Sequence, residues 1–172
     1  MPELDELKFV RVNNPYIFLR IPRALFEQVK GYDFSVNRLI YYGASIAANP
    51  LTYIYAMTDD LDVIRGVFWA RIDIVDETFE VYLISVEPEY QKNTLKKALK
   101  FVRELQEKER PKLEKLGIKL KDKIVLITNQ PKAYEKLGAK PTKRILMEKN
   151  NESKQPEPDD GMVEENPETN TK

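Results

Sequence analysis

The sequence predicts a mixed α/β fold in which helices flank one central sheet. Three runs of strand-like composition follow one another with only turns between them, which is the pattern of an antiparallel meander. A long amphipathic helix comes next, and a short apolar strand follows it. A strand–helix–strand crossover makes its two strands parallel. We therefore expect a sheet that combines an antiparallel meander with one parallel pair.

The part of the chain before the meander contains one predicted strand and two predicted helices. These elements are Lys8–Val12, Pro22–Lys30 and Phe34–Ala48. Proline is tolerated in the first turn of a helix, and Gly31 provides the stop for the first one. Asn49 precedes Pro50, and a residue before proline disfavours helical dihedrals, so the second helix ends there.

The predicted meander consists of Leu51–Met57, Val63–Asp73 and Thr78–Val86. Side chains alternate between the two faces of a strand. In the third strand this alternation places Phe79, Val81 and Leu83 on one face, with Ser85 as the next member.

The second half of the chain opens with the clearest helix, Thr94–Lys108, whose apolar residues form one stripe. Pro111 is expected to end it, because proline lacks an amide hydrogen, and a short turn at Lys112–Leu116 should follow. The remaining predicted elements are a strand at Lys123–Thr128, a helix at Pro131–Leu137 and a strand at Lys143–Glu148.

The 172 residues suit one domain with a tail. We assign residues 1–149 to the domain and residues 150–172 to an acidic, disordered tail, because the tail's only apolar residues are Met162 and Val163. The tail holds seven acids and two lysines, which leaves 26 bases against 21 acids in the domain. The tail either keeps the protein in solution or binds a partner or the basic domain.

The composition excludes several kinds of chemistry. The chain has no cysteine and no histidine, which excludes disulfides, thiol nucleophiles, the usual zinc sites and histidine triads, and we predict no metal site. The N-terminus does not resemble a signal peptide. The uncharged segment Leu39–Thr58 is interrupted by Asn49-Pro50 and reads as a helix and a strand. The expectation is a cytoplasmic protein without membrane contact.

A strand, a turn and a helix start follow one another within Phe79–Leu99, which is the frame of a phosphate-binding loop. No glycine stands between Gly66 and Gly117, and the loop positions hold Lys92, Asn93, Thr94, Leu95 and Lys96. Three alternatives stay open. The Thr94 hydroxyl and the lysines bind phosphate, the added Cβ atoms block it, or the segment is an ordinary helix start.

Two segments resemble the GNAT superfamily of acyl-CoA N-acyltransferases. V-E-P-E-Y-Q-K-N-T-L-K-K-A-L, at Val86–Leu99, is similar to that family's strand, Q/R-x-x-G-x-G/A loop and helix. Gln91 is retained, while Thr94 and Lys96 replace the two glycines. A-Y-E-K-L-G-A-K, at Ala133–Lys140, is similar to the closing helix and the start of the next strand. The resemblance covers roughly Leu7 to Lys149.

The resemblance implies acetyl-CoA as the cofactor. In this family two neighbouring strands splay apart and the pantetheine arm inserts between them; here these would be Thr78–Val86 and Lys123–Thr128. The implied cofactor-binding residues are Ile84, Ser85 and Val86 on the strand, Gln91, Lys92, Asn93, Thr94, Leu95 and Lys96 in the loop, and Asn129.

The resemblance also implies an acid and a base. Glu80 lies eleven residues before Gln91, as the base does in histone-type members, and its apolar neighbours would desolvate it. The alternative is a solvent-facing strand glutamate, and Glu87 and Glu89 are weaker candidates. Tyr134 occupies the position of the family's tyrosine acid, or packs the short helix onto the sheet.

The first hypothesis is therefore an acyl-CoA-dependent N-acyltransferase that transfers an acetyl group to an amine by direct attack. The second is a catalytically degenerate GNAT-like binding or structural protein that has lost acyl-CoA binding. Nucleic-acid binding is disfavoured because the net charge of the domain is only +5 and its basic residues are spread over several elements. The expected partners are acyl-CoA and an unidentified amine, and a homodimer and a partner of the tail are left open.

Overall fold

The computed structural model describes residues 7–29, 35–91, 94–128 and 131–141. Residues Met1–Ala139 form one compact unit. Its elements in chain order are β1 (Lys8–Val12), α1 (Pro15–Phe18), α2 (Arg23–Glu27), α3 (Val36–Ile46), β2 (Thr52–Thr58), β3 (Ile64–Asp73), β4 (Thr78–Val86), a 3-10 turn η2 (Pro88–Tyr90), α4 (Thr94–Lys115), β5 (Ile124–Leu126) and α5 (Pro131–Glu135).

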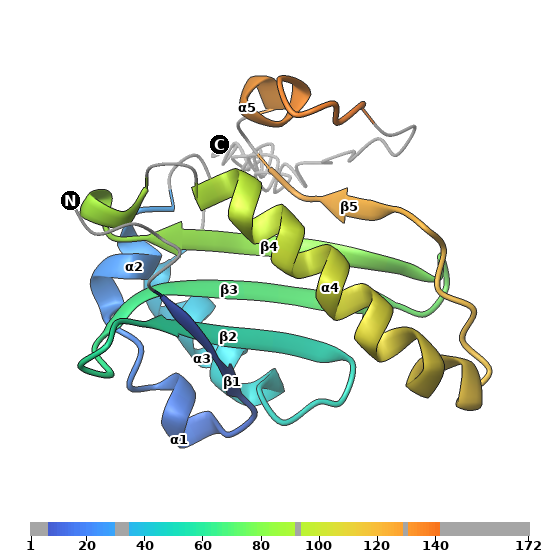
Figure 1. Ribbon diagram of the computed structural model, residues 1–172. Helices are drawn as coiled ribbons and strands as arrows, with labels where there is room; N and C mark the ends of the chain where they lie inside the picture. The colour runs from blue at the N-terminus through green and yellow to red at the C-terminus, as the bar shows by residue number, and fades with distance from the viewer. Residues whose placement is uncertain (1–6, 30–34, 92–93, 129–130, 142–172) are drawn as a thin grey trace, which may run out of the picture. The chain divides into compact units, whose positions relative to one another are not determined.

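The five strands form one sheet in the order β1-β2-β3-β4-β5. Strands β1 to β4 are antiparallel neighbours, and β5 runs parallel to β4 after the crossover through α4. Helix α4 crosses one face of the sheet, while α2 and α3 lie behind the other (Figure 1). The predicted mixed sheet with helices on both faces is confirmed.

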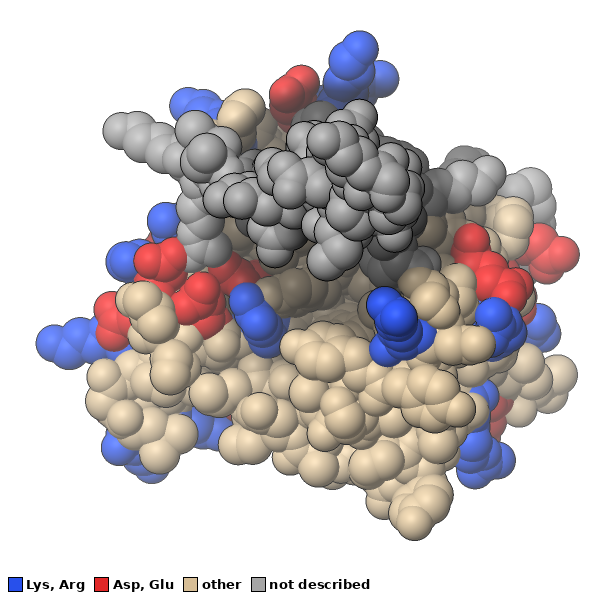
Figure 2. Space-filling model, turned by 180° about the vertical axis from the view of Figure 1, so that it is seen from behind, with Lys and Arg blue, Asp and Glu red and all other residues tan. Residues whose placement is uncertain are grey.

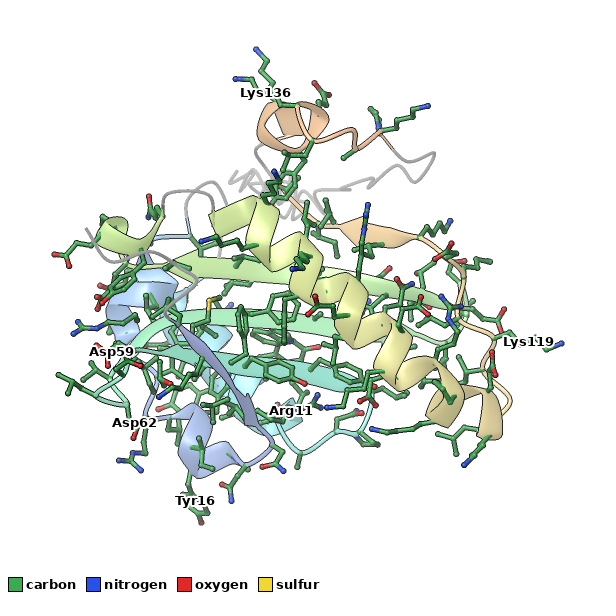
Figure 3. The ribbon with its side chains drawn as sticks, viewed as in Figure 1. Arg11, Tyr16, Asp59, Asp62, Lys119 and Lys136 are labelled. Carbon is green, nitrogen blue, oxygen red and sulfur yellow. The ribbon has the colours of Figure 1, made fainter. Side chains whose placement is uncertain are left out.

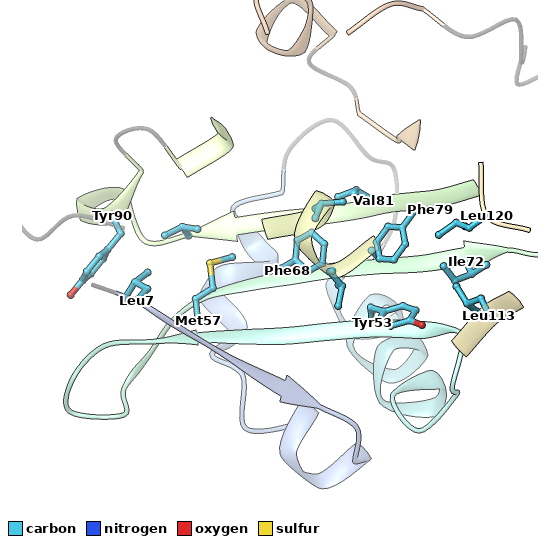
Figure 4. Packing of buried hydrophobic residues seen from close by; sticks show 14 residues of the cluster. Leu7, Tyr53, Met57, Phe68, Ile72, Phe79, Val81, Tyr90, Leu113 and Leu120 are labelled. Carbon is cyan, nitrogen blue, oxygen red and sulfur yellow. The ribbon is translucent and has the colours of Figure 1, made fainter. Parts of the chain in front are cut away.

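Each face of the sheet has its own apolar core. The α4-side core joins sheet residues to the stripe of the long helix, and its members include Met57, Phe68, Phe79, Val81, Val102, Leu105 and Leu113 (Figure 4). The α3-side core joins the other face to the first three helices through Phe18, Leu25, Phe26, Ala44, Trp69 and Leu83. Burial of these side chains is the main favourable term that holds the helices on the sheet.

Strand β4 contains one residue more than its partner, and this bulge corrects the predicted alternation. Val81 pairs with Ala70 and Leu83 pairs with Trp69, so Tyr82 is the inserted residue. As a result Phe79 and Val81 belong to the α4-side core, whereas Leu83 belongs to the α3-side core. The prediction that Leu83 shares a face with Phe79 and Val81 was wrong, because a bulge reverses the alternation beyond it.

Helix α4 continues past Pro111 to Lys115, so the predicted break was also wrong. Leu113 is 3% exposed and packs in the α4-side core. The Arg110 guanidinium donates to the carbonyl of Leu120 on the following loop. These tertiary contacts stabilise the last turn enough to offset the hydrogen bond that proline cannot make.

The first half of the chain differs from the prediction by one short helix. Helix α1 has only four residues; Asn14 caps it by accepting a hydrogen bond from the Tyr16 amide at 2.8 Å, and Pro15 fills its first position. So short a helix leaves no periodic pattern in the sequence. Helix α2 ends at Glu27, so the predicted helix Pro22–Lys30 was too long. Gly31, its predicted stop, and the predicted strand Lys143–Glu148 lie outside the described residues.

Helix α3 packs tightly on α1 at Gly43. A Cβ atom at Gly43 would overlap the ring of Phe18, which is fully buried in the α3-side core. The ring also contacts Phe26 and Trp69, at centroid distances of 5.6 and 6.0 Å, so it has no space into which to move. Only glycine permits this approach of the two helices.

The substitution Gly43→Ala should therefore destabilise the protein by about 1–3 kcal/mol, as overpacking of a core does. Urea unfolding measures the change. Arg38→Ala, on the exposed side of the same helix, is the control and should change the stability by less than about 0.5 kcal/mol. An unchanged midpoint for Gly43→Ala would show that α1 does not pack as described.

Candidate functional site

Glu80 lies buried within β4, and Arg71 and Tyr82 donate three hydrogen bonds to one of its carboxylate oxygens. Its side chain is 1% exposed. The Nε and Nη2 atoms of Arg71 each donate to Glu80 Oε2 at 3.2 Å, and the Tyr82 hydroxyl donates to the same oxygen at 3.2 Å. The alternative of a solvent-facing strand glutamate is therefore wrong. We call Arg71, Glu80 and Tyr82 the Glu80 cluster.

The hairpin between β3 and β4 explains how these three residues meet. Asp73 pairs with Thr78 at its tight end, so Arg71 stands directly opposite Glu80. Tyr82 lies two residues further on the same face, and the Arg71 guanidinium sits 4.6 Å from the centre of its ring. A cation over an aromatic face is attracted to it. Sequence reasoning did not select Arg71, although counting back from the turn would have placed it opposite Glu80.

Aromatic side chains continue the surface beside the Glu80 cluster. The ring of Tyr82 lies 6.5 Å from that of Trp69, which lies 5.8 Å from that of Tyr42 on α3. Trp69 is buried, whereas Tyr42 is 52% exposed. We call Tyr42, Trp69 and Tyr82 the aromatic row. It connects the buried carboxylate to the outer surface of α3.

The molecular face opposite α4 carries little charge over much of its area (Figure 2). Its helices α1 and α3 expose apolar and aromatic side chains, namely Tyr16, Ile17, Tyr41 and Tyr42. A ligand that reaches the Glu80 cluster from this side meets an apolar surface with a charged pair at its end.

The hydroxyl of Tyr82 stays protonated at neutral pH. Burial, together with the charge and the hydrogen bond of Glu80, raises the pKa of Tyr82 from 10.0 to about 12. A phenol in this state can donate a proton to Glu80 and accept one from another group.

Beyond the bulge, one edge of β4 is not paired with β5. The parallel pairing runs from Phe79 to Val81 and ends where the Ile127 amide donates to the Val81 carbonyl at 3.0 Å. The Glu87 amide donates to the Arg65 carbonyl, so the hydrogen bond lies beside the pair Val86–Gly66 and not within it. Val86 therefore belongs to a non-hydrogen-bonded pair, and its own amide and carbonyl point away from β3. The amide and carbonyl of Ile84, two residues earlier, also point away from β3.

The predicted cofactor-binding residues on β4 thus differ in where their polar groups point. The backbone groups of Ile84 and Val86 face the edge of β4 that is not paired with β5, which we call the open edge, and their role in cofactor binding stays a prediction. Ser85 faces β3 through its backbone, and its hydroxyl donates to the carbonyl of Leu25 on α2. Within residues 78–86 the backbone available to an inserted ligand is therefore that of Ile84 and Val86.

The beginning of the predicted phosphate loop is fixed to the sheet. Gln91 donates its side-chain amide to the Val86 carbonyl at 3.0 Å. Arg65 joins Asp59, in the turn between β2 and β3, to Glu87 at 2.8 and 3.1 Å. Asp59 lies at one end of the sheet and Lys119 at the other (Figure 3). The loop therefore starts at the Asp59 end of the sheet.

The rest of the predicted loop is described only in part. Thr94 and Leu95 are the first two residues of α4, and Lys96 is exposed on the first turn of that helix. Lys92, Asn93 and Asn129 lie outside the described residues. The N-terminus of the long helix α4 lies at this point. The predicted phosphate binding depends on the amide groups and the dipole of such a helix start.

Tyr134 lies on α5, as predicted, in a turn closed by backbone bonds. Its carbonyl accepts hydrogen bonds from the amides of Leu137 and Ala139 at 2.9 and 3.1 Å. Gly138 follows with a φ of +86°, the left-handed conformation that ends many helices. The contacts of the Glu80 carboxylate given above come from β3 and β4, so the pairing of Glu80 with Tyr134 stays a prediction.

The described part of the chain shows neither a metal site built from acidic residues nor a membrane-spanning helix. It has no group of three or more acidic residues arranged to hold a metal ion. It also has no helix with the length and apolar character needed to cross a membrane.

Comparison with solved structures identifies the fold. The chain is similar to a possible acetyltransferase from Clostridium difficile 630, with 13% identity, a TM-score of 0.58 and coverage of 84% of this chain and 96% of that one. It is similar to an aminoglycoside N-acetyltransferase solved with CoA, at 15% identity, TM-score 0.57 and coverage of 84% and 93%. It is also similar to glucosamine-6-phosphate N-acetyltransferase from Arabidopsis thaliana, at 14% identity, TM-score 0.53 and coverage of 84% and 98%.

No family model and no curated protein matches the sequence. The structural likeness nevertheless confirms that the chain has the GNAT fold. At these identities the likeness concerns the fold alone, so the activity has to be argued from the site.

The raised pKa of Tyr82 makes the stability depend on alkaline pH. Below pH 10 the phenol is protonated in both the folded and the unfolded protein, and its contribution to the free energy of unfolding is fully present. Between pH 10 and 12 the unfolded protein loses the proton first, so the folded state loses stability. Urea unfolding at pH 8 and pH 11 should show a smaller loss for Tyr82→Phe than for the wild type. Equal losses would contradict the raised pKa of Tyr82, whose largest cause is burial of the phenol.

Proposed function

We propose that this protein is a GNAT-type N-acyltransferase that transfers an acetyl group from acetyl-CoA to an amine. The observation that carries the proposal is the position of the open edge of β4 directly after the Glu80 cluster. Backbone groups that can hold the arm of a thioester and a buried carboxylate that can take a proton lie within five residues of one strand, from Glu80 to Ile84.

The open edge suits an extended amide-containing chain. An inserted chain can pair with a strand edge through main-chain hydrogen bonds, as in β-augmentation. The pantetheine arm of acetyl-CoA contains two amides, and the Ile84 amide and carbonyl are placed to bind one of them. The Val86 carbonyl already accepts a hydrogen bond from Gln91, so its amide is the remaining group there.

Acetyl-CoA supplies the activated acyl group, and the chain supplies the proton transfers. The acceptor nitrogen bonds to the thioester carbonyl carbon and the carbon–sulfur bond breaks. The proton that the nitrogen loses goes to Glu80, and the sulfur takes one proton from the Tyr134 hydroxyl, whose pKa of about 10 in an unperturbed tyrosine suits that role.

Tyr82 is proposed as a relay between the acceptor and Glu80. Because Glu80 is 1% exposed, the nitrogen cannot reach its carboxylate directly. The Tyr82 hydroxyl passes its own proton to Glu80 Oε2 while it takes one from the nitrogen. Its raised pKa keeps the hydroxyl protonated until then.

Binding of the pyrophosphate would rely on the helix start rather than on glycines. The amides at the N-terminus of α4 and the exposed ammonium of Lys96 both attract an anion. The residues proposed to share this role are Gln91, Lys92, Asn93, Thr94 and Leu95, and Asn129 completes the cofactor site.

A proline at position 84 tests the role of the open edge. Ile84→Pro removes an amide that points away from β3, so the antiparallel ladder keeps its hydrogen bonds. The affinity for acetyl-CoA in calorimetry should fall about tenfold, while the circular dichroism spectrum and the folding transition are retained. Ile84→Ala keeps the amide and is the matched control. Equal affinities of the two folded variants would contradict the assignment.

Substitutions of the Glu80 cluster test the chemistry. Glu80→Gln should lower kcat by about 10²–10⁴-fold, as loss of a general base does, while the affinity for acetyl-CoA is retained. Tyr82→Phe should also lower kcat without changing the affinity for acetyl-CoA. Release of CoA from a panel of amines provides the rate. Full activity of Glu80→Gln would eliminate Glu80 as the base.

The competing function is a degenerate GNAT fold that does not bind acyl-CoA. The absence of glycine between Gly66 and Gly117 favours it, since side chains at the loop oppose close approach of a phosphate. Calorimetry of the folded wild type at millimolar acetyl-CoA decides between the two functions. The absence of heat would establish the degenerate function, and saturable binding would exclude it.

A further inference from the structure

We propose that Arg71 binds the carboxylate of the acceptor, so that the acceptors are apolar or aromatic α-amino acids. This inference rests on the proposed function and assigns its substrate class. It follows from the unused donors of Arg71, from the aromatic row beside it and from the charge balance of the Glu80 cluster.

Arg71 has donors to spare. A guanidinium carries five N–H groups in a planar fork. Arg71 directs Nε and Nη2 at the single oxygen Oε2 of Glu80, which leaves Nη1 and the second hydrogen of Nη2 free of partners among the described residues. The Arg71 side chain is 43% exposed, against 1% for Glu80. The pair therefore presents its cation to a ligand and keeps its anion inside.

The arrangement matches an amine and a carboxylate that are bonded to the same carbon atom. A carboxylate bound by the outer donors of Arg71 would bring the neighbouring amine towards Tyr82, whose hydroxyl bonds to the same Glu80 oxygen as Arg71. The proposed anchor and the proposed relay are thus linked through one atom. An α-amino acid has its two charged groups separated by a single carbon, which fits this spacing.

The surface next to the charged pair is apolar. The aromatic row leads from Tyr82 through Trp69 to the half-exposed Tyr42. Aromatic side chains bind apolar and aromatic groups through large contact areas at low entropic cost. An apolar side chain on the acceptor would lie on this row while its carboxylate binds Arg71.

The charge of the cluster disfavours polycations. Glu80 is the only acid in the cluster, and Arg71 already neutralises it. Tyr82 is neutral. A polyamine would meet an exposed guanidinium of like charge and no unpaired acid of the cluster, whereas a carboxylate meets an open donor fork.

Binding of paired ligands tests the proposal apart from catalysis. Calorimetry on the full chain compares apolar and aromatic α-amino acids, such as phenylalanine, with the corresponding amides, which keep the amine and side chain but lack the negative charge. At least one acid should bind about tenfold or more tightly than its amide. Acids and amides that bind alike, or do not bind, would overturn the proposal.

Three variants separate the role of Arg71 from folding and from catalysis. Arg71→Gln/Glu80→Gln removes both charges, so no buried charge is left unpaired, and it should abolish the preference for acids. Glu80→Gln alone keeps Arg71 and should retain the preference while the rate falls. Arg103→Gln, on the exposed side of α4, is the control and should match the wild type. A preference that survives in the folded double variant would exclude Arg71 as the anchor.

The possible failures are distinguishable. If acetyl-CoA binds and amino acids bind through Arg71 but no CoA is released, the proposed acyl transfer fails and the anchor stands. If amines are acetylated with no difference between acids and amides, the acyl transfer stands and the anchor fails.

Discussion

The inserted residue Tyr82 in β4 determines the geometry on both faces of the sheet and at its edge. Before the bulge, Phe79 and Val81 pack under α4, and Val81 bonds to β5 through its backbone. After it, Leu83 packs towards α3, and the backbone groups that face the edge belong to Ile84 and Val86. Beyond the bulge, this edge of β4 has no paired strand among the described residues. Tyr82 lies two residues after Glu80 on the same face of β4, where its hydroxyl donates a hydrogen bond to the Glu80 carboxylate.

A buried carboxylate needs partners, and the Glu80 cluster shows how this fold provides them. Removing a carboxylate from water costs several kcal/mol unless charge and hydrogen bonds compensate it. Arg71 and Tyr82 provide three donors to one oxygen. A hydrophobic residue at position 80 would fill the same space without this cost, which supports the proposal that the cluster has a role in proton transfer. The exposed guanidinium of Arg71 and the protonated phenol of Tyr82 connect the carboxylate to the surface.

Much of the fold could be predicted from the sequence because its elements have strong local patterns. β1 and β4 have the predicted bounds, and the crossover through α4 gives the parallel pair its direction. The predictions failed where tertiary contacts, and not the local sequence pattern, determine the extent of a helix or the presence of a short one. Burial of Leu113 stabilises the part of α4 that follows Pro111, and packing of Phe18 stabilises α1, which has only four residues. The bulge was missed because the apolar run Val81–Ile84 satisfies either alternation.

The site was predicted less completely. Glu80 was selected from its distance to Gln91, and its side chain is buried, while its role as a base stays a prediction. Arg71 and the hydroxyl of Tyr82 were not selected, because their importance depends on the register of β3 against β4. Ser85 was placed with Ile84 and Val86 as one segment, but a strand alternates the direction of its backbone groups as well as its side chains.

Hydrogen exchange of the β4 amides tests most directly the claim that the edge beyond the bulge holds the arm of acetyl-CoA. At saturating acetyl-CoA, exchange of the Ile84 and Val86 amides should slow markedly. The Ser85 amide, which faces β3 in both states, should change much less. Equal effects on the three amides, or unchanged exchange at Ile84 while the ligand is bound, would contradict the claim.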